Sequence, residues 1–146
     1  MISNVKRLRK LVELPARERC LVARAAFLMT AFRLGLWLLP FSRLVALTRR
    51  NEHHLPEAGR YDSARVGWAV HVVSRHVPGA TCLVQALTAK ALLESAGLPA
   101  HLHIGVDKAK DKGFEAHAWV ECQGAVVIGA SGAARFTPLL SVEGGR

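Results

Sequence analysis

The sequence has few cysteines, and nothing in their arrangement would pair them or bind a metal. Cys20, Cys82 and Cys122 are odd in number and lack metal-type spacing, so neither a disulfide framework nor a zinc site is predicted. His101 and His103 share one face of a predicted strand, but without a third clear ligand we expect no metal there. No cofactor is predicted, and a reducing cytoplasm is the simpler setting.

The first part of the chain is poor in acidic residues. Residues 1–60 contain 12 Lys and Arg against 4 Asp and Glu, and so carry +8 of the net charge of +9. Such a basic arm suits nucleic acid, an anionic membrane surface, or an acidic peptide or protein. No zinc finger, RNA-binding aromatic signature or basic region with heptads accompanies the charge. Nucleic acid is therefore the weakest candidate, and we expect no contact with it.

The chain also lacks an uncharged apolar run long enough to cross a membrane, and no secretory signal is visible. Three arginines interrupt the apolar segment 20–47, whose longest uncharged run, Leu34–Ser42, is nine residues, against the roughly 20 that a membrane-spanning helix needs. We expect one or two helices, bent near Gly35 and Pro40, that bury a broad apolar face. Whether that face packs on the rest of the chain, on a membrane surface or on a partner protein is left open.

Two regions are predicted: a basic, apolar helical arm and linker over residues 1–60, and a core over residues 61–146. The core is expected to begin with a helix that Ser63 caps. A second, strong helix is expected over residues 82–96, because good helix formers fill it and Gly and Pro follow it.

After the second helix the apolar pattern changes to a period of two. This alternation predicts strands over 100–107, 115–122 and 125–130. Gln123-Gly124 between the last two is a hairpin turn. Helices followed by an antiparallel sheet define an α+β fold.

Cys82 and His117 are the residues most able to carry chemistry. At the start of a helix, unpaired backbone N–H groups and the helix dipole favour a thiolate and can donate to an oxyanion. A histidine can take up the thiol proton near neutral pH and later give it to a leaving amine. His117 and Trp119 share one face of their strand. A buried thiol beside an ordinary strand is the structural alternative, and residue types alone do not decide between the two.

Three stretches, "CLVQALTAKALLESAGLPAHLHIGV", "FEAHAWVECQGAVVIG" and "FTPL", resemble the transglutaminase-like protease that removes leader peptides in lasso-peptide biosynthesis. This is the peptidase part of the B protein, as in microcin J25-type processing. The resemblance implies a papain-like α+β core and a cytoplasmic cysteine peptidase with Cys82 as nucleophile and His117 as base. It also implies three partners: a ribosomally made precursor peptide, a small leader-recognition protein and an asparagine-synthetase-like cyclase that closes the macrolactam.

The resemblance further implies an aspartate twelve positions after the histidine to orient its ring, but this sequence has Gly129 there. Across the predicted turn the histidine would lie opposite Gly129 or Ala130, which offer no side-chain acceptor. Asp107, near the end of the preceding strand, is one alternative, and Ser131 or a backbone carbonyl are others. Glu121 is less well placed, because it is four residues along the same strand.

Two further residues are candidates for substrate binding. Gln85, one turn after Cys82, could bind the peptide or line the oxyanion site, and Trp119 could pack against substrate. A solvated helix glutamine and a core aromatic are the alternatives.

A second class of function also stays open. The same fold could serve as a non-catalytic module that binds peptide, a partner protein or a membrane surface through the basic arm. Acyl transfer to an amine would use the same two residues as hydrolysis. A position at the inner face of the membrane is left open beside the cytoplasmic one.

Overall fold

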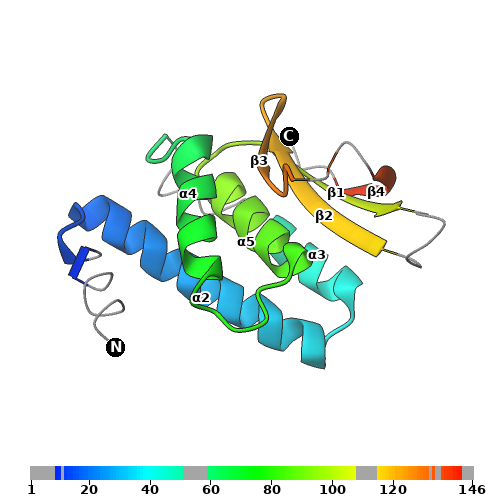
Figure 1. The fold of residues 1–146 in the computed structure, drawn as a ribbon, viewed down its shortest axis with the longest axis horizontal. Coiled ribbons are helices and arrows are strands. Elements are labelled where there is room, and N and C mark those ends of the chain that lie inside the picture. Colours follow the sequence, from blue (N-terminus) through cyan, green and yellow to red (C-terminus); the bar gives the residue numbers. More distant parts are fainter. Residues whose placement is uncertain are drawn as a thin grey trace.

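Helices precede a four-stranded antiparallel sheet in the computed structural model (Figure 1), which describes residues 9–10, 12–50, 59–107, 115–131, 133 and 136–142. The helices are α2 (Ala16–Leu38), α3 (Phe41–Arg50), α4 (Ser63–Ser74) and α5 (Cys82–Ser95). The strands, with sheet order β3-β2-β1-β4, are β1 (Ala100–Asp107), β2 (Glu115–Cys122), β3 (Ala125–Ile128) and β4 (Thr137–Val142). The predicted α+β fold is confirmed.

Helix α5 is the central element, since it lies between α2 and the sheet (Figure 1). One face of α2, including Leu21, Ala25 and Met29, is buried and joins a hydrophobic cluster that also contains Leu87 of α5 and Val120 of β2. This face of α2 thus packs on the rest of the chain. The division of the chain near residue 60 stays a prediction.

The predicted interruption of the apolar segment is confirmed at Pro40, where α2 has ended and α3 has not begun. Gly35 does not end the helix. It lies inside α2, where a Cβ would stand 2.6 Å from a methyl carbon of Leu44 in α3. The missing side chain lets the two helices approach each other closely.

Both core helices begin with a capping side chain. Asp62, and not the predicted Ser63, caps α4, with its carboxylate accepting from the N–H of Arg65 at 2.7 Å. The prediction was wrong by one residue because Asp62 takes the extended backbone conformation that an N-cap requires. Thr81 caps α5 and accepts from the N–H of Val84 at 3.4 Å.

The hairpin of β2 and β3 turns at Gln123-Gly124, as predicted, with φ of 54° and 79° at the two residues. Its register shifts once: Glu121 pairs with Val126, whereas Val120 pairs with Ile128. This bulge adds one residue to β3, and the strand ends at Ile128, two residues earlier than predicted. The described ladder between β2 and β3 therefore stops short of His117, and the predicted opposition of His117 to Gly129 or Ala130 does not follow from the turn.

Strand β2 buries one face against α5, as the alternating pattern predicts. Ala118, Val120 and Cys122 are at most 2% exposed.

In the second half of α5, the fully buried Lys90 is ion-paired with Glu94, and its ammonium group donates to the carbonyl of Ala100 at 3.1 Å. These contacts join the last turn of α5 to the start of β1.

Candidate active site

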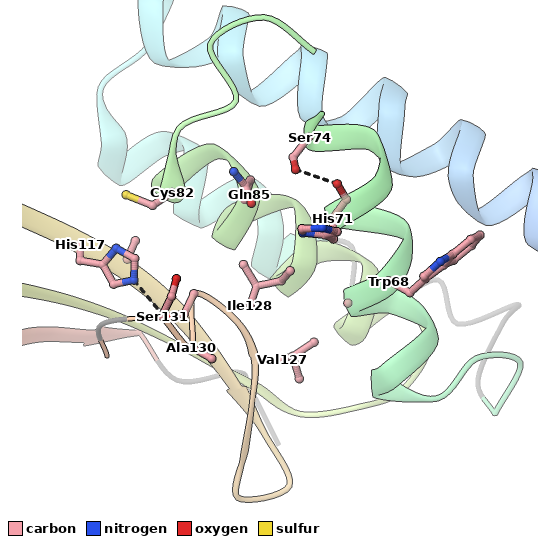
Figure 2. A pocket seen from close by; sticks show the side chains of 13 residues that line it. Trp68, His71, Ser74, Cys82, Gln85, His117, Val127, Ile128, Ala130 and Ser131 are labelled. Atoms are coloured by element: carbon pink, nitrogen blue, oxygen red, sulfur yellow. Dashed lines mark hydrogen bonds between the residues drawn. The ribbon is translucent and has the colours of Figure 1, made fainter. Parts of the chain in front are cut away.

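A cavity of about 640 Å³ lies between α4, the start of α5 and the β2–β3 hairpin (Figure 2). Cys82, Gln85 and His117 all line it, although 35 positions separate the cysteine from the histidine. Apart from His117 and His71, its described lining residues are uncharged, without Asp, Glu, Lys or Arg. The fold thus brings the two candidate catalytic residues predicted from the sequence to one cavity.

Cys82 is the first residue of α5 and is partly buried. The Thr81 cap occupies the N–H of Val84, and the N–H of Gln85 donates to the Thr81 carbonyl at 3.0 Å. Neither contact uses the N–H groups of Cys82 and Leu83. A helix start offers such N–H groups to an anion, so they can stabilise negative charge that develops beside the sulfur.

Gln85 lines the cavity one turn further along α5. Its side-chain amide nitrogen donates to the carbonyl of Ala80 at 2.8 Å, just before the cap of the helix. This bond fixes the side chain against the loop that leads into Cys82 and leaves the amide oxygen to accept from a ligand.

The ring of His117 is oriented by a backbone carbonyl. Its Nε2 lies 2.9 Å from the oxygen of Gly129 (Figure 2). A carbonyl only accepts, so Nε2 carries the proton, and Nδ1 is left as the basic nitrogen of the neutral ring. The tautomer assigned in this way is the one that a general base needs.

Two aromatic rings stack on His117. The Phe136 ring lies 5.0 Å away, centroid to centroid, with an interplanar angle of 26°, and the Trp119 ring lies 6.2 Å away at 19°. Gly105 is paired with His117 across β1 and β2, and a Cβ there would approach the Cβ of Phe136 to 2.9 Å. The absence of a side chain at Gly105 makes room for this stack.

Gly129 occupies the position where the family resemblance implies an aspartate. Its φ is +82°, which disfavours residues with a side chain. A Cβ would also stand 2.7 Å from the carbonyl oxygen of Ala118 and 2.8 Å from the Cβ of Trp119. An aspartate does not fit this backbone, and the acceptor for His117 is the main chain of the same residue, one of the alternatives that the sequence left open.

The other proposed orienting groups lie elsewhere or are not described. The backbone of Asp107 pairs with Glu115 at the end of β1, and its side chain lies outside the described part of the structure. The Glu121 carboxylate accepts from Nε1 of Trp119 at 3.3 Å and lies 3.6 Å from Nε2 of His103. Glu121 is thereby engaged away from His117.

Trp119 does not line the cavity. It is 4% exposed and stacks on the rings of His103 and His117. Its observed contacts are those of a core aromatic, the alternative to substrate packing.

The cavity is also lined by two residues of α4, His71 and Ser74, to which the sequence interpretation gave no role there. Their spacing from Gly67, by four and seven residues, puts all three on one helix face and is the signal that could have found them.

The remaining cysteines differ from Cys82 in their surroundings. Cys122 is buried, and burial raises the pKa of its thiol. Cys20 is exposed on α2. Within the described residues, no group of three His, Cys, Asp or Glu side chains is arranged to hold a metal ion.

These features define a class of protein, an α+β fold in which a cysteine at a helix start shares a cavity with a strand histidine. Residues 26–141 match the model of the family described as the Transglutaminase-like superfamily, and the chain belongs to this superfamily. Its members are commonly cysteine proteases or acyltransferases. No curated protein and no solved structure matches the chain.

Proposed function

We propose that the protein is a cysteine peptidase that removes the leader peptide from a ribosomally made lasso-peptide precursor. The observation that carries the peptidase assignment is the placement of Cys82 and His117 on one cavity, with Nδ1 of the histidine as its basic nitrogen. Support for the lasso-peptide precursor as substrate comes from the resemblance of the stretches around Cys82, His117 and Phe136. The resemblance also supports a separate leader-recognition protein and an ATP-using cyclase as partners.

The proposed reaction uses the side chains of Cys82 and His117. His117 takes the thiol proton at Nδ1 as the sulfur of Cys82 attacks the carbonyl carbon of the last leader residue. The oxyanion that forms accepts hydrogen bonds from N–H groups at the start of α5. His117 then protonates the nitrogen of the departing core peptide, and the carbon–nitrogen bond breaks to leave a thioester. Water, deprotonated by the same histidine, hydrolyses the thioester and restores the thiol.

The cavity lining limits what the substrate can present. Because its described residues other than two histidines are uncharged, a charged side chain that entered would lose hydration without gaining a partner of opposite charge. We therefore expect uncharged side chains next to the cleaved bond.

A cleavage assay tests the assignment. Full-length protein, the precursor and the recognition protein are incubated, and mass spectrometry follows the release of the leader. We expect Cys82→Ala and His117→Ala to abolish release and Cys20→Ala, at an exposed cysteine outside the cavity, to leave it unchanged. Undiminished cleavage by either cavity variant would contradict the mechanism.

A non-catalytic module is the second candidate, and one observation favours it. In the described part of the structure, no hydrogen bond joins the thiol of Cys82 to the ring of His117. A thiol-directed electrophile at neutral pH separates the two functions. A catalytic Cys82 should react faster than the exposed Cys20, whereas a rate equal to or below that of Cys20 would favour the module. Cys122 should stay unmodified because burial raises the pKa of its thiol.

Acyl transfer to an amine is distinguished by its product. Cleavage in the presence of a primary amine yields a free carboxylate on the leader if water is the acceptor, and an amide if the amine is.

A further inference from the structure

The outer face of α2 carries a stripe of exposed apolar side chains. Phe27 is 73% exposed, Leu34 57%, Trp37 89% and Leu38 80%. Phe27, Leu34 and Leu38 are spaced by seven and four residues, so they point to the same side of the helix, with Trp37 beside Leu34. From Phe27 to Leu38 the stripe extends about 16 Å along the axis. Exposed large apolar groups gathered in this way mark an interaction surface.

The segment that carries this stripe has charges of one sign. Between residues 19 and 51 the chain contains six arginines and no Asp or Glu. The two described acidic side chains that precede this segment are already paired with arginines, Glu13 with Arg9 at 3.7 Å and Glu18 with Arg65 at 3.0 Å. A partner that covers the stripe therefore meets positive charge and gains from being anionic.

The stripe does not belong to the candidate active site. Its residues do not line the cavity that contains Cys82, and α2 lies behind α4 and α5 in the view of that cavity (Figure 2). A contact on the outer face of α2 would leave the cavity open to a peptide.

We propose that the outer face of α2 binds an anionic lipid surface, with the helix lying in the plane of the headgroups. A basic helix with an exposed apolar face binds membranes in this way, through burial of apolar area and attraction to anionic lipid. Tryptophan is the side chain most suited to the boundary between headgroups and acyl chains, and Trp37 is the most exposed large apolar residue described. The inference is independent of the peptidase activity.

A lipid surface fits the stripe better than a protein partner for a geometric reason. Protein hot spots place an aromatic anchor in a pocket of the partner and surround it with a polar rim. Here the exposed apolar groups extend along the helix from Phe27 to Leu38. By length and composition α2 could also cross a membrane, but its other face is buried against α4 and α5. That packing favours a position on the surface.

Vesicle flotation with the full-length protein tests the proposal. The probes are vesicles of phosphatidylglycerol with phosphatidylcholine, and vesicles of phosphatidylcholine alone. We expect binding to the first only, and weaker binding at about 1 M salt, where the Debye length falls to roughly 3 Å. The variant Trp37→Ser/Leu38→Ser should lower the partition coefficient at least about tenfold. Leu139→Ser, at a 67% exposed leucine on β4, is the matched control and should bind like the wild type.

Three results of the flotation assay would overturn the proposal: no binding to anionic vesicles, equal binding by the double variant, or equal loss in Leu139→Ser. A wild-type dimer that the double variant dissociates would also overturn it, because a second copy would then cover the stripe. Phe27→Ser gives an independent reading at another point of the same stripe. Thermal unfolding of each variant shows that the fold is retained, as expected for exposed positions.

Discussion

Cys82 and His117 line the same cavity, yet different kinds of contact fix the two side chains. Cys82 is placed by its own helix, since α5 starts at this residue and the cap is its neighbour Thr81. His117 is placed by residues distant in sequence, the carbonyl of Gly129 and the ring of Phe136. Local structure is robust to changes elsewhere, whereas an orientation built from several segments depends on each of them. We therefore expect activity to be more sensitive to substitutions among the contacts of His117 than to substitutions among the contacts of Cys82.

Removal of the thiol of Cys82 or of the ring of His117 should have the largest effect on catalysis. The two losses should be similar, whatever contacts fix each side chain. We expect Cys82→Ala and His117→Ala each to lower kcat by about 10³-fold or more, and the double variant to lose no more than the worse single one, since the two groups act as a unit. Single-turnover cleavage of the precursor measures this. Additive losses would show that the two residues act separately.

Gly129→Ala should be the most damaging change that leaves both reactive groups in place. A side chain is strained at φ +82°, and the Cβ would meet Ala118 and Trp119, so we expect a loss of about 2–4 kcal/mol in the free energy of unfolding. Cleavage should also fall, because the carbonyl that orients His117 must move. Urea denaturation and the cleavage assay give the two readings.

Gly124→Ala is the matched control for this change. Gly124 has a similar φ of +79°, but a Cβ there would meet nothing within 4 Å. We expect a cost of about 1 kcal/mol and unchanged cleavage. If the two glycine variants lost the same stability and activity, the close packing around Gly129 would have no role in holding the histidine.

Phe136→Leu should act on the orientation of His117 with a smaller effect on the fold. The ring stack is lost while an apolar side chain remains, so we expect kcat to fall about tenfold with little change in KM. Phe32→Leu in the helical layer is the control, because Phe32 and Phe136 are both 8% exposed. An equal fall in kcat in both variants would mean that Phe136 acts only through stability.

Thr81→Ala should give the smallest effect and tests the cysteine side. The cap bond to Val84 is long, at 3.4 Å, so we expect a loss of about 1 kcal/mol or less, with recovery in Thr81→Ser. The alkylation rate of Cys82 relative to Cys20 should fall only slightly. Asp62→Ala removes the corresponding cap of α4 and should cost similar stability without changing that rate. A large loss of Cys82 reactivity in Thr81→Ala, but not in Asp62→Ala, would show that activity depends more on the cap beside Cys82 than on the contacts of His117.

Much of the fold could be predicted because the signals are local. The helix that begins at Cys82, the strands Ala100–Asp107 and Glu115–Cys122, and the turn at Gln123-Gly124 lie where the sequence pattern puts them. Capping, apolar period and turn chemistry each depend on a few neighbouring residues. Even the error at the cap of α4 is a displacement of one residue, from Ser63 to Asp62.

The burial of charged side chains was not predictable in this way. Lys90 and Glu94 are four residues apart on a helix, a spacing typical of a solvent-exposed pair. In the fold Lys90 is fully buried, and the carbonyl of Ala100 accepts from it.

The exposure of apolar side chains from Phe27 to Leu38 was not predictable either. The sequence indicated an apolar helix but not which of its faces the core would cover.

The sequence by itself determined the elements that carry the two candidate catalytic residues, Cys82 and His117. Only the tertiary structure decided what orients the histidine, because the bulge in β3 and the positive φ at Gly129 bring a main-chain carbonyl to the ring where no side chain fits. The physical reason is the distance along the chain over which each interaction acts. Side-chain periodicity and capping are short-range preferences, whereas the partner of His117 depends on the register of two strands and on the packing of Trp119 and Phe136 around them.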